Sequence, residues 1–284
     1  EVPHVLELDL EPCVGSVEMA EAFSRAGRTR GQPVPIHLKV NTGMNRFGFS
    51  WRNVDSWGPH LGALPGLEFR GALSHFAQSD ELDKGFARTQ SQRFEGVLER
   101  LAILSIQPQW IHHCNSGGVL DLPDAHFNRV RVGLLAQGVY PSEVCRRLEG
   151  VLPVLSLRAR LTAIQELETG DTVGYGMRWQ AQRPSRIGVL SVGYGDGYPR
   201  LRNQGQVLLH GRRVPIVGGV TMDALMIDLA DVPEAQVGNE AVLLGMQGTD
   251  CITVQELARL SGTVTYDVLA GFRARLPRVY CPQV

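Results

Sequence analysis

The first half of the chain alternates short apolar runs with longer amphipathic stretches, and this alternation constrains the fold most strongly. A short apolar run is typical of a buried strand, whereas apolar residues at three- and four-residue spacing are typical of a helix. Strands that alternate with helices form βα units, with a parallel sheet and right-handed crossovers. The apolar runs are His4–Leu10, Pro35–Val40, Phe69–Phe76, Trp110–Cys114 and Val130–Leu135. The helical patterns include Val17–Ala26 and Thr89–Leu104.

This spacing of strands corresponds to much of a (β/α)₈ barrel, so we predict an α/β fold with a TIM-type barrel segment over residues 1–150. Polar residues lie at or just after the ends of these runs, and they are Asn41, His75, Asn115 and Arg131. Barrel enzymes build their active sites at the carboxyl ends of the strands. The sequence therefore predicts a site at this edge of the sheet.

The second half has a different character, with short β-rich runs separated by Gly, Pro and Asp turns. We predict one helix over Thr253–Leu260, with Thr253 and Glu256 as a capping box. Residues 151–284 therefore form a mostly antiparallel β domain in this prediction. The β-rich runs are Leu155–Ala163, Ile187–Val192, Gln206–Leu209, Leu225–Leu229 and Ala241–Leu244.

Composition excludes several classes of function. With 28 basic and 29 acidic residues, the net charge of -1 gives no general attraction to nucleic acid or anionic membranes. No apolar run reaches the roughly 18 residues that span a bilayer, and no secretory leader is evident, so we expect a cytoplasmic protein. The five cysteines show no CxxC pairing, which favours free thiols over a zinc site. We expect Cys114 to be a packing residue.

Several residues in these motifs have both a structural and a functional interpretation. Arg46 could meet an anionic or phenolic oxygen, or could belong to an ordinary solvated loop. His75 could be a site residue or a satisfied core histidine. Ser116 and the amides that follow it could cradle a phosphate if a helix begins there. Arg131 lies in an apolar run and needs a partner, which could be a ligand or a buried carboxylate.

Adjacent histidines, His112 and His113, point to opposite faces of a strand, so we predict no metal site. The octapeptide GYGDGYPR, residues 193–200, is a glycine-rich loop that follows an apolar strand. Taken alone it is consistent with a plain hairpin, but it carries two tyrosines and a carboxylate at fixed spacing. The other motifs in the sequence favour a functional loop over a plain hairpin.

Seven motifs in order resemble the alanine racemase family, whose members join a barrel to a β domain (fold type III) and use pyridoxal 5′-phosphate (PLP). The resemblance covers nearly the whole chain. It implies racemisation of alanine by two bases, which supplies D-alanine for peptidoglycan in the cell wall. The motifs are HLKVNTGMNRFG, LSHFAQSD, HHCNSGG, RVRVGLL, VGYGMRW, VGYGDGYPR and VGGVTMD.

By this resemblance Arg131 faces the pyridine nitrogen of PLP. A guanidinium stays protonated at working pH, so it keeps the ring nitrogen unprotonated and makes the ring a weaker electron sink. Arg46 contacts the phenolic oxygen of PLP or the substrate carboxylate. The remaining cofactor-binding residues implied by the resemblance are His112, Asn115, Ser116, Gly133 and Leu134.

The resemblance makes Tyr175 one of the two catalytic bases, supplied to the site of a partner subunit. Because the ordinary pKa of tyrosine is about 10, a base at neutral pH needs help, and His75 is the expected relay between Tyr175 and Arg131. Met222 and Asp223 match substrate-contacting positions, and Tyr194 lines the entrance. A site shared in this way implies an obligate homodimer.

One family feature is missing from this sequence. The family's Schiff-base lysine lies in a Lys-Ala-Asn-Ala-Tyr motif, and only two lysines, Lys39 and Lys84, occur here. Lys39 is expected to orient Arg46, and Lys84 to lie in a charged surface stretch. We therefore expect an N-terminally truncated barrel that lacks its first strands and is inactive as given. The alternatives are a non-catalytic dimerisation module and a serine or broad-specificity racemase, with a PLP decarboxylase of the same fold type less favoured.

Overall fold

The computed structural model describes residues 1–281, which divide into two compact units. The N-terminal unit contains Glu1–Ala136 and Tyr140–Gly150. The C-terminal unit contains Gln137–Val139 and the described residues from Val151 onward. Each unit has its own sheet, and the two sheets have different topologies.

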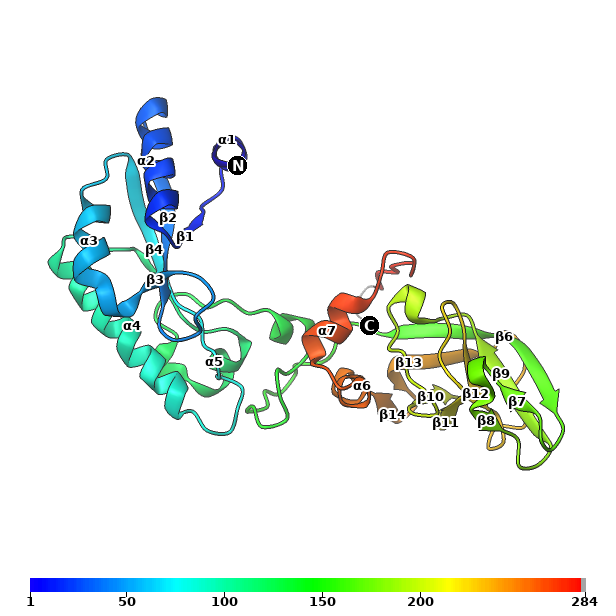
Figure 1. Ribbon diagram of the computed structural model, residues 1–284. Coiled ribbons are helices and arrows are strands. Elements are labelled where there is room, and N and C mark those ends of the chain that lie inside the picture. Colours follow the sequence, from blue (N-terminus) through cyan, green and yellow to red (C-terminus); the bar gives the residue numbers. More distant parts are fainter. Residues whose placement is uncertain (282–284) are drawn as a thin grey trace. The chain divides into compact units, whose positions relative to one another are not determined.

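The N-terminal unit is built on a five-stranded parallel sheet of order β1-β2-β4-β5, with β3 paired to β2 (Figure 1). Helices connect β1 to β2, β3 to β4 and β4 to β5, so the predicted α/β fold and the parallel sheet of a partial barrel are confirmed. The strands are β1 (Cys13–Val14), β2 (Val34–Asn41), β3 (Phe49–Ser50), β4 (Leu67–Leu73) and β5 (Trp110–His112). The helices are α1 (Val2–Glu7), α2 (Val17–Arg30), α3 (Val54–Gly62), α4 (Gly85–Ile103) and α5 (Ser116–Asp121).

Two of the predicted strands are wrong. The run His4–Leu10 overlaps helix α1, because Val2, Val5 and Leu6 follow helical spacing and pack together against the core. The run Val130–Leu135 forms no ladder beyond an isolated bridge at Arg129. Its backbone amides find other acceptors instead, and Ser116 is one of them.

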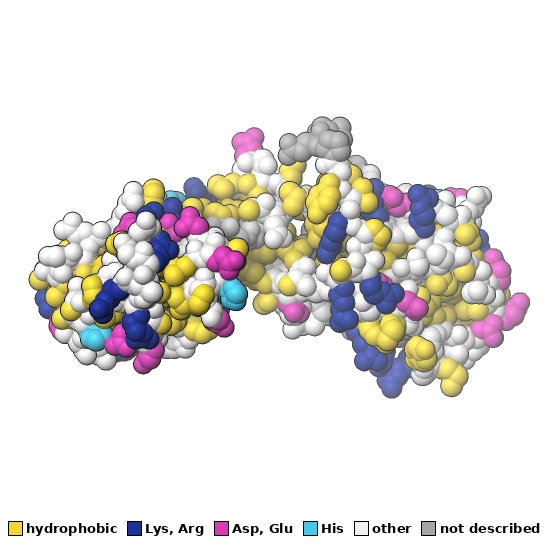
Figure 2. Space-filling view, turned by 90° about the horizontal axis from the view of Figure 1, so that it is seen from above, with side chains coloured by type: hydrophobic (Ala, Val, Ile, Leu, Met, Phe, Trp, Pro, Cys, Tyr) yellow, Lys and Arg dark blue, Asp and Glu magenta, His cyan; other side chains and the backbone are white. Residues whose placement is uncertain are grey.

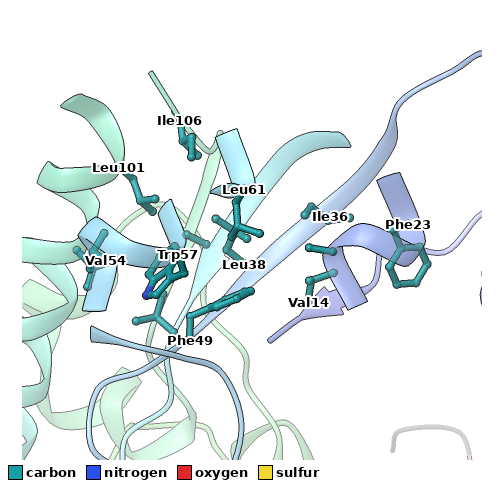
Figure 3. Packing of buried hydrophobic residues seen from close by; sticks show 14 of the residues in the cluster. Val14, Phe23, Ile36, Leu38, Phe49, Val54, Trp57, Leu61, Leu101 and Ile106 are labelled. Atoms are coloured by element: carbon teal, nitrogen blue, oxygen red, sulfur yellow. The ribbon is translucent and has the colours of Figure 1, made fainter. Parts of the chain in front are cut away.

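The core of the N-terminal unit lies between the sheet and its helices (Figure 3). Strand β2 is buried on both faces, as is usual in a parallel sheet. Its Ile36 and Leu38 are fully buried, and Trp57 of α3 stacks on Phe49 with ring centroids 4.8 Å apart. These contacts hold the strand whose carboxyl end carries part of the candidate site.

The C-terminal unit contains a seven-stranded antiparallel sheet that closes on itself. The order is β10-β11-β12-β9-β6-β13-β14, and β10 also pairs with β13, so six strands form a closed barrel without a free edge. This confirms the predicted antiparallel β domain. The strands are β6 (Leu157–Leu167), β9 (Ser185–Leu190), β10 (Gln206–Leu209), β11 (Arg212–Val217), β12 (Leu225–Asp228), β13 (Glu240–Gln247) and β14 (Asp250–Ile252). A separate pair is β7 (Thr172–Val173) and β8 (Trp179–Gln180).

Two helices follow the barrel, α6 (Val254–Ser261) and α7 (Thr265–Gly271). The first was predicted and the second was not. Only half of the predicted capping box is present among the described residues: Thr253 Oγ1 accepts a hydrogen bond from the amide of Glu256. The Glu256 carboxylate instead accepts one from Arg213 Nη1, because that guanidinium offers a charged partner.

Charged side chains of both signs are spread over the visible surface of both units, with apolar side chains between them (Figure 2). This mixture matches the net charge of -1. Within residues 1–281, none of the helices combines the length and the apolar character that crossing a bilayer requires.

Replacing Leu38 by alanine is expected to lower the free energy of unfolding by about 2–5 kcal/mol, because the deletion leaves a cavity in a packed core. The side chain of Leu38 is fully buried. The matched control is Leu82→Ala, the same change at a side chain that is 81% exposed, which should stay within about 0.5 kcal/mol of the parent. Urea titration followed by tryptophan fluorescence measures both. Equal losses would contradict the placement of Leu38 in the core.

Candidate active site

The register of the parallel sheet brings three strand ends into one row. Lys39 of β2 lies opposite Leu73 of β4, and Leu73 lies opposite His112 of β5. Residues that follow these positions therefore share one edge of the sheet, as the sequence predicted. Ser74 and His75 follow β4 directly at this edge.

The Arg131 guanidinium is the centre of this edge. Its Nη1 donates to His112 Nδ1 at 2.7 Å and to the His112 carbonyl at 2.9 Å. Its Nη2 donates to the carbonyls of Ser74 at 2.7 Å and His113 at 3.2 Å, and lies 3.3 Å from His75 Nδ1. All five acceptors are neutral. The alternative of a buried ion pair is therefore not observed for Arg131 among the residues that the structure describes.

Burial and the Arg131 charge keep the neighbouring imidazoles neutral. They lower the pKa of His75 to about 4 and that of His112 to about 3, with burial the larger cause in each case. A guanidinium has no acceptor, so His75 Nδ1 and His112 Nδ1 must accept its hydrogen bonds. Each ring therefore carries its proton on Nε2.

Lys39 lies beside these groups in the same row. Burial, followed by the charge of Arg131, lowers the pKa of the Lys39 ammonium to about 8, and the Cys13 thiol opposes the shift. Lys39, Arg46 and His75 line one small pocket at the strand edge. Arg46 itself is exposed, so its guanidinium is free to meet a ligand from solvent.

Ser116 links the start of helix α5 to the segment after Arg131. Its Oγ accepts hydrogen bonds from the amide of Gly133 at 3.0 Å and from that of Leu135 at 3.3 Å. Asn115 caps the helix by accepting from the amide of Gly118 at 3.0 Å. A Cβ at Gly133 would meet nothing within 4 Å, so there is open space beside the hydrogen bonds that Ser116 accepts. The predicted residues Asn115, Ser116, Gly133 and Leu134 therefore lie together, with Leu134 buried behind them.

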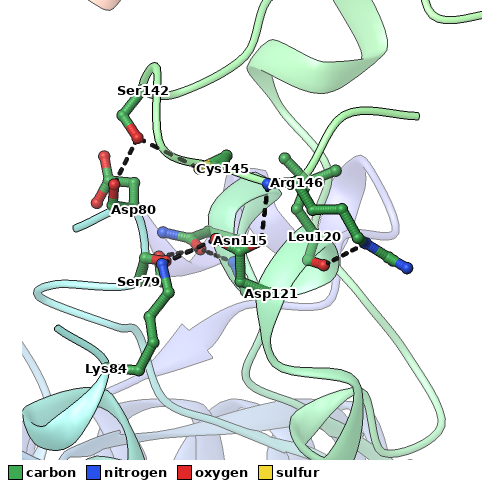
Figure 4. A network of polar contacts seen from close by, with 10 residues as sticks. Ser79, Asp80, Lys84, Asn115, Leu120, Asp121, Ser142, Cys145 and Arg146 are labelled. Carbon is green, nitrogen blue, oxygen red and sulfur yellow. Dashed lines mark hydrogen bonds and ion pairs between the residues drawn. The ribbon is translucent and has the colours of Figure 1, made fainter. Parts of the chain in front are cut away.

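A network of polar contacts around helix α5 holds Asn115, the residue that caps this helix (Figure 4). Ser79 Oγ donates to Asn115 Oδ1 at 2.7 Å, and Lys84 Nζ donates to the Ser79 carbonyl at 2.8 Å. Lys84 also pairs with Asp121 at 2.8 Å, with only 14% and 11% of the two side chains exposed. The prediction of a surface position for Lys84 is therefore wrong, because its ammonium bridges the helix and the preceding loop.

His113 and Cys114 follow strand β5 directly, and both are fully buried. Cys114 is fully buried, and burial raises the pKa of its thiol to about 12, so it packs rather than reacts. The ring of His113 stacks on Phe76 with centroids 3.7 Å apart and lies 5.2 Å from the ring of Phe94. His112 and His113 thus point to opposite faces, and residues 1–281 contain no cluster of His, Cys, Asp and Glu suited to a metal ion.

The C-terminal unit carries the other predicted residues. Tyr175 lies between two glycines with positive φ, Gly174 at 73° and Gly176 at 74°, and this tight turn leaves its side chain 84% exposed. Tyr175 and Tyr194 line a cavity of about 640 Å³ together with Arg200 and Arg202. Two tyrosines and two cations at one cavity form a polar, anion-attracting surface.

The octapeptide loop is tied to the predicted substrate loop. The amide of Tyr194 donates to the Thr221 carbonyl at 3.0 Å, and that of Gly195 donates to the Met222 carbonyl at 2.7 Å. Asp223 follows directly and, like Met222, is exposed. A Cβ at Gly193 would lie 2.3 Å from the Thr221 carbonyl oxygen, so this contact requires glycine.

The other polar groups of the octapeptide are structural in this unit. Asp196 Oδ2 accepts from the amide of Gly193 at 2.9 Å, and Asp196 Oδ1 pairs with Arg275 at 3.2 Å. Tyr198 is buried, and burial raises the pKa of its phenol. Of the two tyrosines in this loop, Tyr194 is therefore the one that can meet a ligand.

Sequence analysis missed His37 and Glu11. His37 Nδ1 lies 2.8 Å from His112 Nε2, and His37 Nε2 lies 2.9 Å from Glu11 Oε2. The available signal was a histidine inside the apolar run Pro35–Val40, since a buried polar side chain needs a partner.

Replacing His113 by phenylalanine is expected to make stability less sensitive to acid. Burial lowers the pKa of His113 to about 3 in the folded chain, against about 6.5 when unfolded. Between these values the unfolded chain binds the extra proton, so the free energy of unfolding falls as pH drops from 6.5. The substitution removes this contribution, which amounts to about 2 kcal/mol between pH 7 and pH 5. Urea midpoints at the two pH values measure it, and an unchanged pH dependence would contradict the neutral buried state of His113.

Comparisons with known proteins cover both units. The family model "Alanine racemase, N-terminal domain" matches residues 1–141, and "Alanine racemase, C-terminal domain" matches residues 154–280. The alanine racemase of Nostoc sp. is 36% identical over 282 residues, which are 98% of this chain and 73% of that protein.

Solved structures agree with the sequence matches. The crystal structure of alanine racemase from E. faecalis has a TM-score of 0.89 and 32% identity, covering 99% of this chain and 75% of that one. The structure from Bartonella henselae, described with covalently bound pyridoxal phosphate, has a TM-score of 0.87 and 25% identity, covering 98% and 75%. Because both family models match and the identity extends over nearly the whole chain, this protein belongs to the alanine racemase family.

Proposed function

We propose that this chain provides the PLP-binding edge and the β domain of an alanine racemase that interconverts L- and D-alanine. The observation that carries the proposal is the Arg131 guanidinium, which is held by neutral acceptors alone among the described residues. A fixed cation without a carboxylate partner suits a neutral ring nitrogen as a further acceptor. The Bartonella henselae relative, which carries covalently bound pyridoxal phosphate, supports PLP as the group.

The donors at this edge fit PLP. Arg131 would meet the ring nitrogen, with His112 behind it, and Arg46 the phenolic oxygen or the substrate carboxylate. Ser116, Gly133 and Leu134 would hold the phosphate beside the open space at Gly133, with Asn115 fixing the helix end. PLP supplies an electron sink for the charge that develops at Cα when its proton is removed. A guanidinium that does not give up its proton limits that sink, which favours simple return of a proton over side reactions.

Tyr175 takes or returns the α-proton at one face of alanine in this proposal. The ordinary pKa of a tyrosine is about 10, so a phenolate at neutral pH needs stabilisation. His75 supplies it, because its Nδ1 accepts from Arg131 and its Nε2–H remains free to donate to the phenol oxygen. The low pKa of His75, about 4, keeps that donor in its neutral form through the physiological range.

The proposed site is shared between two copies of the chain. Tyr175 is 84% exposed and Met222 56% exposed, although a catalytic base and a substrate contact both need enclosure. A homodimer resolves this, with Tyr175, Tyr194, Met222 and Asp223 presented to the barrel edge of the partner subunit. The D-alanine product would serve peptidoglycan synthesis in the cytoplasm.

Neither lysine of this chain is the proposed cofactor lysine. Lys84 is committed to its ion pair with Asp121. Lys39 shares a pocket with Arg46 and suits the role of orienting that guanidinium. In this proposal the 284-residue sequence holds no Schiff-base lysine, and we expect it to be inactive on its own. A non-catalytic dimerising module is the second candidate, favoured by this same shortage of lysines. A racemase that acts on serine or on a broader range of amino acids is a variant of the first candidate, the alanine racemase.

Borohydride trapping tests the lysine proposal. The 284-residue chain is incubated with PLP, reduced and mapped by mass spectrometry. We expect no stoichiometric pyridoxyl label on Lys39 or Lys84, because both amines already have other roles. The positive control is the Bartonella henselae alanine racemase, which is described with covalently bound pyridoxal phosphate. Stoichiometric label at Lys39 would show that this residue is the cofactor lysine.

Tyr175→Phe tests the two-base scheme in any form of the protein that racemises alanine. The variant should lose racemisation by about a hundredfold or more, the usual range for a general base. Exchange of the α-proton with deuterium oxide should persist for one alanine enantiomer and be lost for the other, because one face keeps its base. The control is Tyr280→Phe, the same change at a side chain that is 92% exposed. Equal loss of exchange from both enantiomers would reject the scheme.

A further inference from the structure

A continuous chain of hydrogen bonds extends from Arg131 across the parallel sheet. Arg131 Nη1 donates to His112 Nδ1 at 2.7 Å, and His112 Nε2 lies 2.8 Å from His37 Nδ1. His37 Nε2 then lies 2.9 Å from Glu11 Oε2. Both imidazoles are buried, with about 5% of each residue exposed. Every ring nitrogen of the two histidines is therefore used.

Chemistry fixes the direction of this chain. A guanidinium can only donate, so His112 Nδ1 accepts and the single proton of His112 lies on Nε2. That proton is donated to His37 Nδ1, which leaves the single proton of His37 on Nε2. The Glu11 carboxylate can only accept, so it receives this last hydrogen bond. No other arrangement of protons satisfies all three contacts.

The sheet provides a space for the chain that only glycine leaves open. His37 of β2 pairs with Gly71 of β4, and His112 lies on β5 at the far side of β4. The His37 ring reaches His112 by lying over Gly71. A Cβ on Gly71 would lie 2.0 Å from His37 Nδ1, which is an impossible contact.

At the outer end of this hydrogen-bond chain, Glu11 has a second partner, the Arg70 guanidinium. Glu11 Oε1 accepts from Arg70 Nη1 at 3.1 Å, and Arg70 Nε donates to Glu68 Oε1 at 2.7 Å. The amide of His37 donates to the Pro12 carbonyl at 2.9 Å, next to Glu11. The carboxylate therefore has a fixed position from which to orient His37.

We propose that Glu11, His37 and His112 are positioning residues that orient the Arg131 guanidinium through this one-directional chain, with Gly71 as the residue that makes it possible. The role toward PLP rests on the proposed function. The chain is not a proton wire, because its inner end is a guanidinium that keeps its protons at working pH. It restricts rotation of the guanidinium, and it connects this half-buried positive charge to the Glu11 carboxylate through two neutral imidazoles.

Nuclear magnetic resonance of protein labelled with ¹⁵N-histidine tests the hydrogen-bond chain without any cofactor. At pH 7 both His37 and His112 should be Nε2–H tautomers with slowly exchanging Hε2 protons. In Glu11→Gln the amide oxygen still accepts, so both signals should remain. In Glu11→Ala the His37 Hε2 proton loses its acceptor, so its signal should shift or exchange away. An Nδ1–H tautomer at either histidine would overturn the proposal.

Gly71→Ala tests the space over strand β4. The added methyl should displace the His37 ring and change the Hε2 signals of both histidines. The matched control is Gly96→Ala in helix α4, where a Cβ would meet nothing within 4 Å. Unchanged histidine signals in a folded Gly71→Ala protein would contradict the proposed path. If that variant does not fold, the Glu11 pair decides alone.

A PLP titration and an assay of product ratio test the consequence for the site. Glu11→Ala and His37→Phe should weaken PLP binding or racemisation by about 10–100-fold, the range of outer hydrogen-bond partners at metal sites. They should also raise transamination relative to racemisation, which a general loss of stability would not do, and Glu11→Gln should restore the ratio. Unchanged binding, rate and ratio would overturn the positioning role. If the unsubstituted protein binds no PLP, the proposed function is rejected. The histidine tautomers would still test the hydrogen-bond chain from Arg131 to Glu11.

Discussion

The site depends on one guanidinium that has neutral partners. Arg131 donates to carbonyl oxygens and imidazole nitrogens, and in the described residues it makes no ion pair. A half-buried cation normally finds a carboxylate, because transfer of an unpaired charge from water is costly. Here several hydrogen bonds to neutral acceptors offset that cost. The carboxylate that ends the hydrogen-bond chain is Glu11, and the imidazoles of His112 and His37 lie between it and Arg131. The charge therefore stays available to a ligand while its position is fixed.

Glycines make this arrangement possible at places far apart in the sequence. Gly71 leaves room for the His37 ring, and Gly193 allows the octapeptide loop to approach Thr221. Gly174 and Gly176 take positive φ angles that expose Tyr175. Because glycine has no Cβ, each of these positions allows either a close contact or a turn that other residues rarely adopt. In the proposed site, glycines that leave space or permit a turn are therefore needed as well as charged side chains.

The order of the motifs predicted the family, the parallel sheet and the β domain, because these depend on local periodicity and short loops. The same reasoning misplaced two strands: spacing in α1 is helical, and the amides around Gly133 bind Ser116 instead of a neighbouring strand. It also placed Arg131 at the site but missed His37, whose partner His112 lies 75 residues away. Contacts between distant strands depend on register, and register is not visible in one stretch of sequence.

The proposed homodimer accounts for a difference between the two units in how they hold their polar groups. The N-terminal unit holds its polar groups in a connected, oriented network from Glu11 to His75. The C-terminal unit instead exposes Tyr175 and Met222, although phenol and thioether side chains gain by burial. An exposed phenol in bulk water has no reason to become a base near neutral pH, whereas one enclosed beside a neutral imidazole donor does. In the proposed homodimer, His75 of one subunit would offer such a donor at Nε2 to Tyr175 of the other, and the phenol would become reactive only in that assembly.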